Sequence, residues 1–166
     1  MDEAMKRAAI AICTLLLGCD DSGSSGDAGP ATSSDVPAEK VALEAWLKAR
    51  SYASWKKESA PHASEGPHGD AVRTYVNPVL DGSLARGDAE HPTGAAAVKE
   101  LIRADDIVGW AASVKTDQGK SGDGWFWLEI TDAKMGTATL SGQGEPVCKR
   151  CHAGGRDFVL SPYPLR

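Results

Sequence analysis

Apolar positions follow two different periods along the chain, a helical period first and a strand period later. Between residues 38 and 57 they recur three and four positions apart, which predicts a helix with one apolar stripe, broken around Ser51. Pro37 suits the first turn of such a helix, with Ser34 or Asp35 as its cap. The stripe consists of Ala42, Ala45, Trp46, Ala49 and Ala53.

After a loop rich in proline and glycine at residues 58–70, the period changes to two. Alternation over residues 72–76 predicts a strand that ends at Asn77-Pro78. Because the connections are short, we expect antiparallel pairing. The sequence therefore predicts a mainly β or α+β fold, with an antiparallel β-sheet, an N-terminal helix and a C-terminal segment that carries two cysteines. Four further strands are expected at residues 95–102, 107–115, 125–131 and 137–140.

The first residues have the layout of an export signal. Lys6 and Arg7 precede an apolar run over residues 8–17 that is too short to span a bilayer, which is typical of a signal peptide. The run ends in Leu-Leu-Gly-Cys, which resembles the bacterial lipobox and marks Cys19 for lipidation. The alternative is cleavage elsewhere, with Cys19 left as an ordinary thiol.

These patterns divide the chain into three parts. Residues 1–18 are expected to be a lipoprotein signal peptide, residues 19–35 a flexible linker, and residues 36–166 one folded domain. The protein is then exported and held by its lipid on the bacterial membrane, facing the periplasm. A net charge of −5 gives no basic surface for nucleic acid, which excludes that class of partner.

The residues with the clearest chemistry are Cys148, Cys151 and His152, which form the C-x-x-C-H pattern of c-type haem attachment. Two thiols at this spacing can add to the two vinyl groups of one porphyrin, and the adjacent imidazole then binds the iron. The pattern predicts one covalent haem c with His152 as the proximal iron ligand. A redox disulfide between the two cysteines is an alternative. A zinc site is another, although the chain has no second cysteine pair of this kind.

The sixth iron ligand separates electron carriers from enzymes and gas binders. None of the fourteen residues after His152 is methionine or histidine, and Met135 is the one methionine outside the leader. His62, His68 and His91 are expected to be exposed loop residues. An open, five-coordinate iron is therefore favoured.

Lys99 lies in the expected strand at residues 95–102. A period of two places it on the same face as Ala95, Ala97 and Leu101, where small side chains leave room for a flat cofactor. The alternative is an ordinary exposed lysine. Glu100 points to the opposite face.

Residues 72–166 resemble the cytochrome P-460 family, which includes the cytochromes c′-beta. The resemblance implies a mainly antiparallel β fold, often a homodimer, with a five-coordinate haem c that is open on its distal side. It rests on the order and spacing of several short segments, namely Val72 to Pro78, Gly94 to Glu100, Gly109 to Lys115, Gly124-Trp125, the C-x-x-C-H pattern, and Asp157 to Pro164.

In the P-460 branch a strand lysine, which matches Lys99, is bonded to the porphyrin edge, and the protein oxidises hydroxylamine. A distal arginine that orients substrate or a haem propionate matches Arg73. The family's distal carboxylate aligns with Ala111, so the proton acceptor is missing from that position. The c′-beta branch lacks the lysine and binds nitric oxide instead.

The resemblance thus leaves three functions open. The first is hydroxylamine oxidation, with electrons passed to a periplasmic partner. The second is binding of nitric oxide without turnover. The third is electron transfer, with Met135 or a loop histidine as the sixth ligand.

Overall fold

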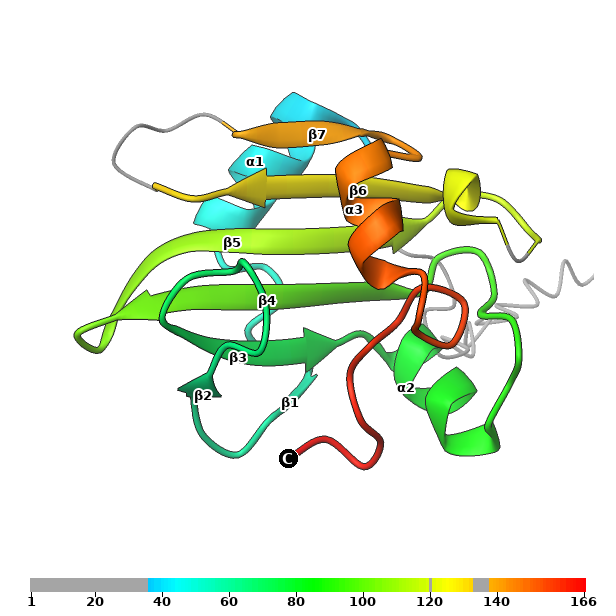
Figure 1. Cartoon of the computed structure of the whole chain (residues 1–166), viewed down its shortest axis with the longest axis horizontal. Helices are drawn as coiled ribbons and strands as arrows, with labels where there is room; N and C mark the ends of the chain where they lie inside the picture. Colours follow the sequence, from blue (N-terminus) through cyan, green and yellow to red (C-terminus); the bar gives the residue numbers. More distant parts are fainter. Residues whose placement is uncertain (1–35, 120, 133–137) are drawn as a thin grey trace, which may run out of the picture.

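The computed structural model describes residues 36–119, 121–132 and 138–166. The signal peptide, the lipidated Cys19 and the linker expected for residues 1–35 lie outside this range, as does Met135. In the described residues, seven strands form one antiparallel sheet in the order β1-β3-β4-β5-β6-β7, and β2 also pairs with β3 (Figure 1). The strands are β1 (Lys56–Lys57), β2 (His62–Ala63), β3 (Ala71–Val76), β4 (Ala96–Arg103), β5 (Asp106–Lys115), β6 (Trp125–Ile130) and β7 (Leu140–Gln143).

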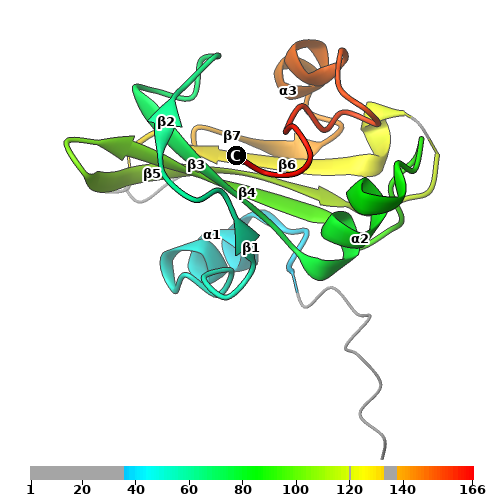
Figure 2. The same ribbon diagram turned by 90° about the horizontal axis from the view of Figure 1, so that it is seen from below.

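Helices lie on both faces of this sheet. Helix α1 (Lys40–Lys48) covers one face, while α3 (Pro146–His152) and the C-terminal segment lie on the other, as the edge-on view shows (Figure 2). Helix α2 (Pro78–Arg86) connects β3 to β4 at one end of the sheet. No helix in the described ranges has the length and apolar character needed to cross a membrane.

The expected fold class is confirmed, and so are four of the expected strands, which correspond to β3, β4, β5 and β6. The last strand is displaced. It was expected at residues 137–140, whereas β7 begins at Leu140 and pairs with β6 over Leu140–Gln143.

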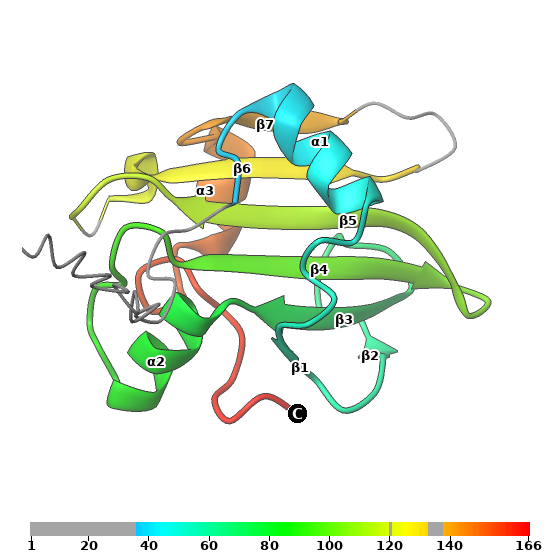
Figure 3. The same ribbon diagram turned by 180° about the vertical axis from the view of Figure 1, so that it is seen from behind.

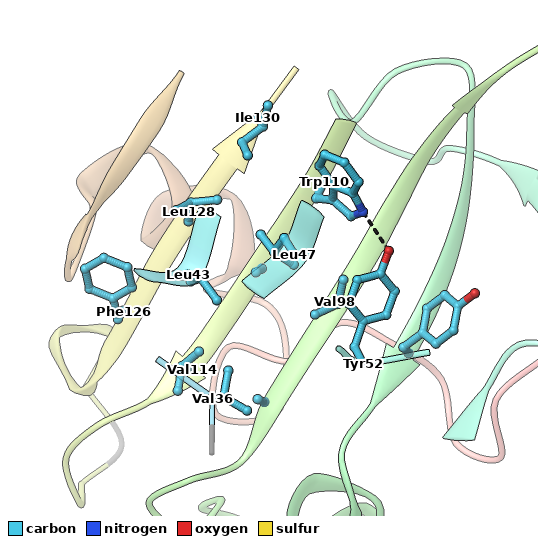
Figure 4. Packing of buried hydrophobic residues seen from close by; sticks show 13 residues of the cluster. Val36, Leu43, Leu47, Tyr52, Val98, Trp110, Val114, Phe126, Leu128 and Ile130 are labelled. Atoms are coloured by element: carbon cyan, nitrogen blue, oxygen red, sulfur yellow. Dashed lines mark hydrogen bonds between the residues drawn. The ribbon is translucent and has the colours of Figure 1, made fainter. Parts of the chain in front are cut away.

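Helix α1 differs from its prediction in length and in the face that it buries. It begins after Glu39, whose carboxylate accepts hydrogen bonds from the backbone N–H groups of Val41 and Ala42, so neither Ser34 nor Asp35 caps it. It ends before Arg50, which adopts a φ of 54°. Helix α1 lies across the sheet (Figure 3). The predicted alanine stripe is wrong, because Leu43 and Leu47 are the buried residues of the helix and bury more apolar surface than alanine (Figure 4).

Two helices were not expected. Helix α2 has clear local signals, since Asn77 accepts a hydrogen bond from the N–H of Leu80, Pro78 opens the helix, and Gly87 ends it at a φ of 73°. Helix α3 carries the C-x-x-C-H pattern itself, with Pro146 in its first turn.

The face under α1 is the main hydrophobic core, and a buried polar network lies at its edge (Figure 4). Glu100, on β4, is 3% exposed and accepts hydrogen bonds from the hydroxyls of Tyr52 (2.9 Å) and Tyr75 (3.0 Å). Arg50 donates to the same carboxylate at 3.0 Å, and the Trp110 indole donates to the Tyr52 hydroxyl at 2.6 Å. The carboxylate is buried at low cost because each of its oxygens is hydrogen-bonded.

We expect Glu100→Ala to lower the free energy of unfolding by about 3 kcal/mol, because two tyrosine hydroxyls and an arginine lose their acceptor together. Unfolding in urea measures this. Glu65→Ala is the matched control, since Glu65 is exposed and pairs only with Arg166 at the surface, and it should cost about 0.5 kcal/mol. Equal losses in the two variants would contradict the structural role of the network.

Candidate functional site

A pocket lies on the face of the sheet opposite α1. Helix α3 and the C-terminal segment cover it. Its enclosed part has a volume of about 80 Å³, and it continues into a mouth that is open to solvent. Its apolar wall is formed by side chains from β4, β5, β6, β7, α3 and the segment after it, namely Ala97, Ala111, Ala112, Trp127, Leu128, Leu140, Val147, Phe158, Val159 and Leu160.

The register of the sheet determines which side chains face this pocket. Lys99 on β4 is paired with Ala111 on β5, which is paired with Glu129 on β6. Thr74 on β3 is paired with Lys99 on its other side. Paired residues project from the same face of a sheet, and all four line the pocket.

The two cysteines of the C-x-x-C-H pattern reach the pocket from α3. Cys148 is half-buried and Cys151 is exposed, and both are free thiols. Burial raises the pKa of the Cys148 thiol to about 11, which keeps it protonated at neutral pH. This environment does not favour redox exchange, because such chemistry needs a thiolate.

His152, at the end of α3, is held in place by a hydrogen bond from its ring nitrogen Nδ1. Its Nδ1 lies 2.9 Å from the carbonyl oxygen of Phe158, so Nδ1 carries the proton and donates. The Trp127 ring packs against the imidazole with 4.8 Å between centroids. Burial lowers the pKa of His152, which favours the neutral form with a lone pair on Nε2. That is the tautomer that a metal-binding imidazole requires.

Lys99 is the least compensated charge in the pocket. Burial lowers the pKa of its amine, although the more distant carboxylates of Glu58 and Glu129 oppose the shift. Lys99 is partly buried, and among the described residues its Nζ makes no hydrogen bond or ion pair, whereas the fully buried Lys115 is paired with Asp157. A desolvated amine of this kind is a nucleophile.

Glu129 and His68 also belong to the pocket. From the sequence, His68 is only one of three loop histidines that could be a sixth ligand, and Glu129 is not singled out. His68 Nδ1 lies 2.9 Å from Glu129 Oε1, and their side chains are only 17% and 12% exposed. The His68 and His152 rings are 6.1 Å apart between centroids. A charged residue in the otherwise apolar strand β6, two positions after Trp127, is the signal that could have identified Glu129.

The remaining candidate residues lie elsewhere. Arg73 is paired with Glu100, so it projects from the opposite face, and its guanidinium donates to the carbonyl oxygens of Glu58 and Ser59. The structure therefore does not bring Arg73 to the pocket. His62 contacts Glu58, and His91 is fully buried against Ser83. The expectation that these histidines are exposed loop residues was wrong, because His91 is buried, His68 is partly buried, and His62 is partly buried on strand β2.

The residues present fit a flat, apolar group with a metal at its centre. The pocket offers two thiols, one imidazole with a free Nε2 and a wall of small apolar side chains. The residues fit a bare metal ion less well, because no group of three His, Cys, Asp or Glu side chains that could hold one is found in the described ranges. Haem c uses the same thiols and imidazole without needing a fourth protein ligand.

The chain matches no known protein-family profile, and no curated protein is significantly similar to it. The resemblance to the cytochrome P-460 family therefore stays a prediction from the sequence.

We expect Lys99→Met to raise the free energy of unfolding of the haem-free chain by about 1 kcal/mol, because the variant keeps the volume and removes a desolvated amine. The pKa of this amine is lowered in the folded chain, so its protonated form destabilises the fold. The gain is therefore largest at low pH. It shrinks as the pH rises towards the ordinary lysine pKa, where the unfolded chain also loses the proton.

Urea unfolding at several pH values measures the effect, and Lys57→Met, on exposed strand β1, is the control that should change little. A Lys99→Met variant that is less stable than the wild type at every pH would show that the amine is stabilised by its surroundings.

Proposed function

We propose that this protein is an exported mono-haem cytochrome of the P-460 type that oxidises hydroxylamine or a related small nitrogen compound. One observation carries the proposal. Cys148, Cys151 and His152 lie about fifty residues after Lys99 in the sequence, yet all four line one apolar pocket. The C-x-x-C-H pattern alone is compatible with any c-type cytochrome. A desolvated, unpaired lysine facing it is an added feature that an ordinary electron carrier does not need.

In this proposal Cys148 and Cys151 hold the haem through thioether bonds and His152 binds its iron through Nε2. When bound, the haem supplies a site for the substrate nitrogen and a path for its electrons. The wall of the pocket is mostly apolar, which strengthens the effect of each polar group in it.

The neutral amine of Lys99 would form a bond to a carbon at the porphyrin edge. This N–C bond replaces one N–H and one C–H bond, so two electrons and two protons leave. A peroxide supplied from outside the protein would accept them and become two waters. The lowered pKa of Lys99 supports this role, since only the neutral amine is nucleophilic.

Hydroxylamine oxidation also needs a proton acceptor, because NH₂OH → NO releases three protons and three electrons. The resemblance leaves that acceptor missing at Ala111. Glu129 lies directly across from Ala111 on the neighbouring strand and faces the same pocket, with His68 bound to it. We therefore assign the role of proton acceptor to Glu129, while the electrons pass to an external one-electron periplasmic redox partner.

Export and anchoring belong to the same proposal, because haem c is attached outside the cytoplasmic membrane. The signal peptide and Cys19 would deliver the domain there and hold it at the membrane surface.

The absorption spectrum of the holoprotein tests the lysine bond. We expect a Soret band strongly shifted to the red in the wild type and returned to an ordinary haem c position in Lys99→Ala. Lys99→Arg is the matched control, because it keeps a long cation without an amine nucleophile, and it should also lose the shift. Both variants should keep the haem mass. The Cys148→Ser/Cys151→Ser variant should lose it.

An unshifted five-coordinate spectrum in the wild type would overturn the lysine bond and favour a nitric-oxide binder. A six-coordinate low-spin spectrum would favour an electron carrier. His68 is the candidate sixth ligand for that case, since it is the one loop histidine that lines the described pocket. If the low-spin spectrum were lost in His68→Ala, the carrier function would replace the enzymatic one.

Turnover tests the proton acceptor. We expect Glu129→Gln to lower kcat for hydroxylamine about a hundredfold, because a positioned base contributes roughly that much, while the haem spectrum stays unchanged. Adding Ala111→Glu to Glu129→Gln should restore part of the rate, because position 111 faces the same space. Steady-state reduction of a one-electron acceptor dye measures both. Equal rates in Glu129→Gln and the wild type would remove Glu129 from the mechanism.

A further inference from the structure

A fully buried ion pair lies beside the pocket without lining it. Lys115, at the end of β5, and Asp157, in the segment after α3, have side chains with no exposed surface. The Lys115 Nζ lies 2.8 Å from one carboxylate oxygen of Asp157 and 3.0 Å from the other. Burying two charges is costly unless both have a complete set of hydrogen-bond partners, so the presence of this pair needs an explanation.

The pair has those partners. The backbone N–H of His91 donates to Asp157 Oδ2 at 2.9 Å, and the Trp125 indole lies 3.5 Å from Oδ1. Lys115 also donates to the carbonyl oxygen of Gly119 and lies over the Trp125 ring. The carboxylate of Asp157 is therefore anchored to β5, to β6 and to the segment before β4.

Asp157 itself belongs to a turn with an unfavourable backbone. Asp157 has a φ of 43° and Phe158 a φ of 66°, so two successive residues other than glycine are left-handed. Arg156 and Val159 exchange two backbone hydrogen bonds of 3.0 Å across this turn. Two left-handed central residues normally call for Asn-Gly or Gly-Gly, so local preference does not explain this turn.

The turn has one clear effect on the site. It directs the carbonyl of Phe158 at His152, where the oxygen accepts the Nδ1–H hydrogen bond at 2.9 Å. That bond sets which ring nitrogen keeps its lone pair, and it makes the imidazole a stronger electron donor to a metal.

We propose that the Lys115–Asp157 pair is a positioning device for His152. By anchoring the carboxylate, it holds the 156–159 turn in its left-handed form and so maintains the hydrogen bond from His152 Nδ1. Neither residue touches the haem site. The inference rests on the proposed function in so far as His152 binds iron, but the effect on the turn does not depend on haem.

Two double variants test this on the full chain, Lys115→Met/Asp157→Ala and Lys115→Met/Asp157→Gly. Both remove the pair without leaving an unpaired charge, and both deprive His91 and Trp125 of the same acceptor. They differ in the cost of the left-handed conformation at position 157, which glycine adopts freely and alanine does not. The alanine variant should therefore lose the His152 hydrogen bond and the glycine variant should keep it.

The first readout is exchange of the His152 Nδ1 proton in the haem-free chain, followed by NMR. We expect exchange about tenfold faster in the alanine variant and near the wild-type rate in the glycine variant. In the holoprotein, the iron–histidine stretching band should move to lower frequency in the alanine variant alone, with a rise in the reduction potential.

If both variants behave like the wild type, or if both lose the hydrogen bond to the same extent, the pair does not act through the turn and the inference is wrong. If no form of the protein carries haem, the proposed function fails instead. The exchange rates in the haem-free chain still decide whether the pair holds the turn.

Discussion

The alternation of side chains along β4 sends Lys99 and Glu100 to opposite faces of one sheet, and the rest of the structure depends on that separation. Both faces are covered, so Glu100 is buried and Lys99 is partly buried. Under α1, Glu100 is surrounded by donors, and the result is a neutralised, rigid network. Under α3, Lys99 has no such partner among the described residues, burial lowers the pKa of its amine, and two free thiols line the same pocket. A shift of one residue in register would exchange the two and destroy both.

The second face shows how a site is kept reactive inside a stable fold. Its polar groups are held by hydrogen bonds to neighbouring residues. The Phe158 carbonyl fixes the tautomer of His152, and His68 orients Glu129. The small side chains of Ala97 and Ala111 leave space in the pocket. The stability needed for this is supplied across the sheet, where the large apolar side chains Leu43, Leu47 and Trp110 are concentrated. The fold can tolerate an unpaired lysine on the pocket face because the opposite face, under α1, carries the main hydrophobic core and, in the part of the chain that the structure describes, no unpaired charge of this kind.

The sequence was sufficient to predict the main strands of the sheet and some of the residues of the candidate site, and the physical reason differs between the two. Strands β3 to β6 follow from a period of two, and the same period placed Lys99 on the pocket face and Glu100 on the other. The cysteine spacing identified Cys148, Cys151 and His152 without any fold. The α1 stripe failed because size, as well as spacing, decides which face is buried, and Leu43 outweighs Ala42. Glu129 and His68 could not be paired from sequence, because their contact depends on how the 64–70 loop returns over β6.

The contrast between Arg73 and Glu129 bears on the enzymatic reading. The resemblance implies a distal arginine at Arg73 and no carboxylate at Ala111. In the structure Arg73 projects from the opposite face, and the carboxylate of Glu129, on the next strand, faces the pocket. For hydroxylamine oxidation the second change matters more, because substrate orientation can be met by the walls of a narrow pocket. Proton removal requires a base at hydrogen-bonding distance. A pure gas binder gains nothing from an oriented carboxylate in an apolar cavity, where its burial is costly. Under the proposed function, the His68–Glu129 pair would serve a reaction that releases protons, a role that reversible binding of nitric oxide does not need.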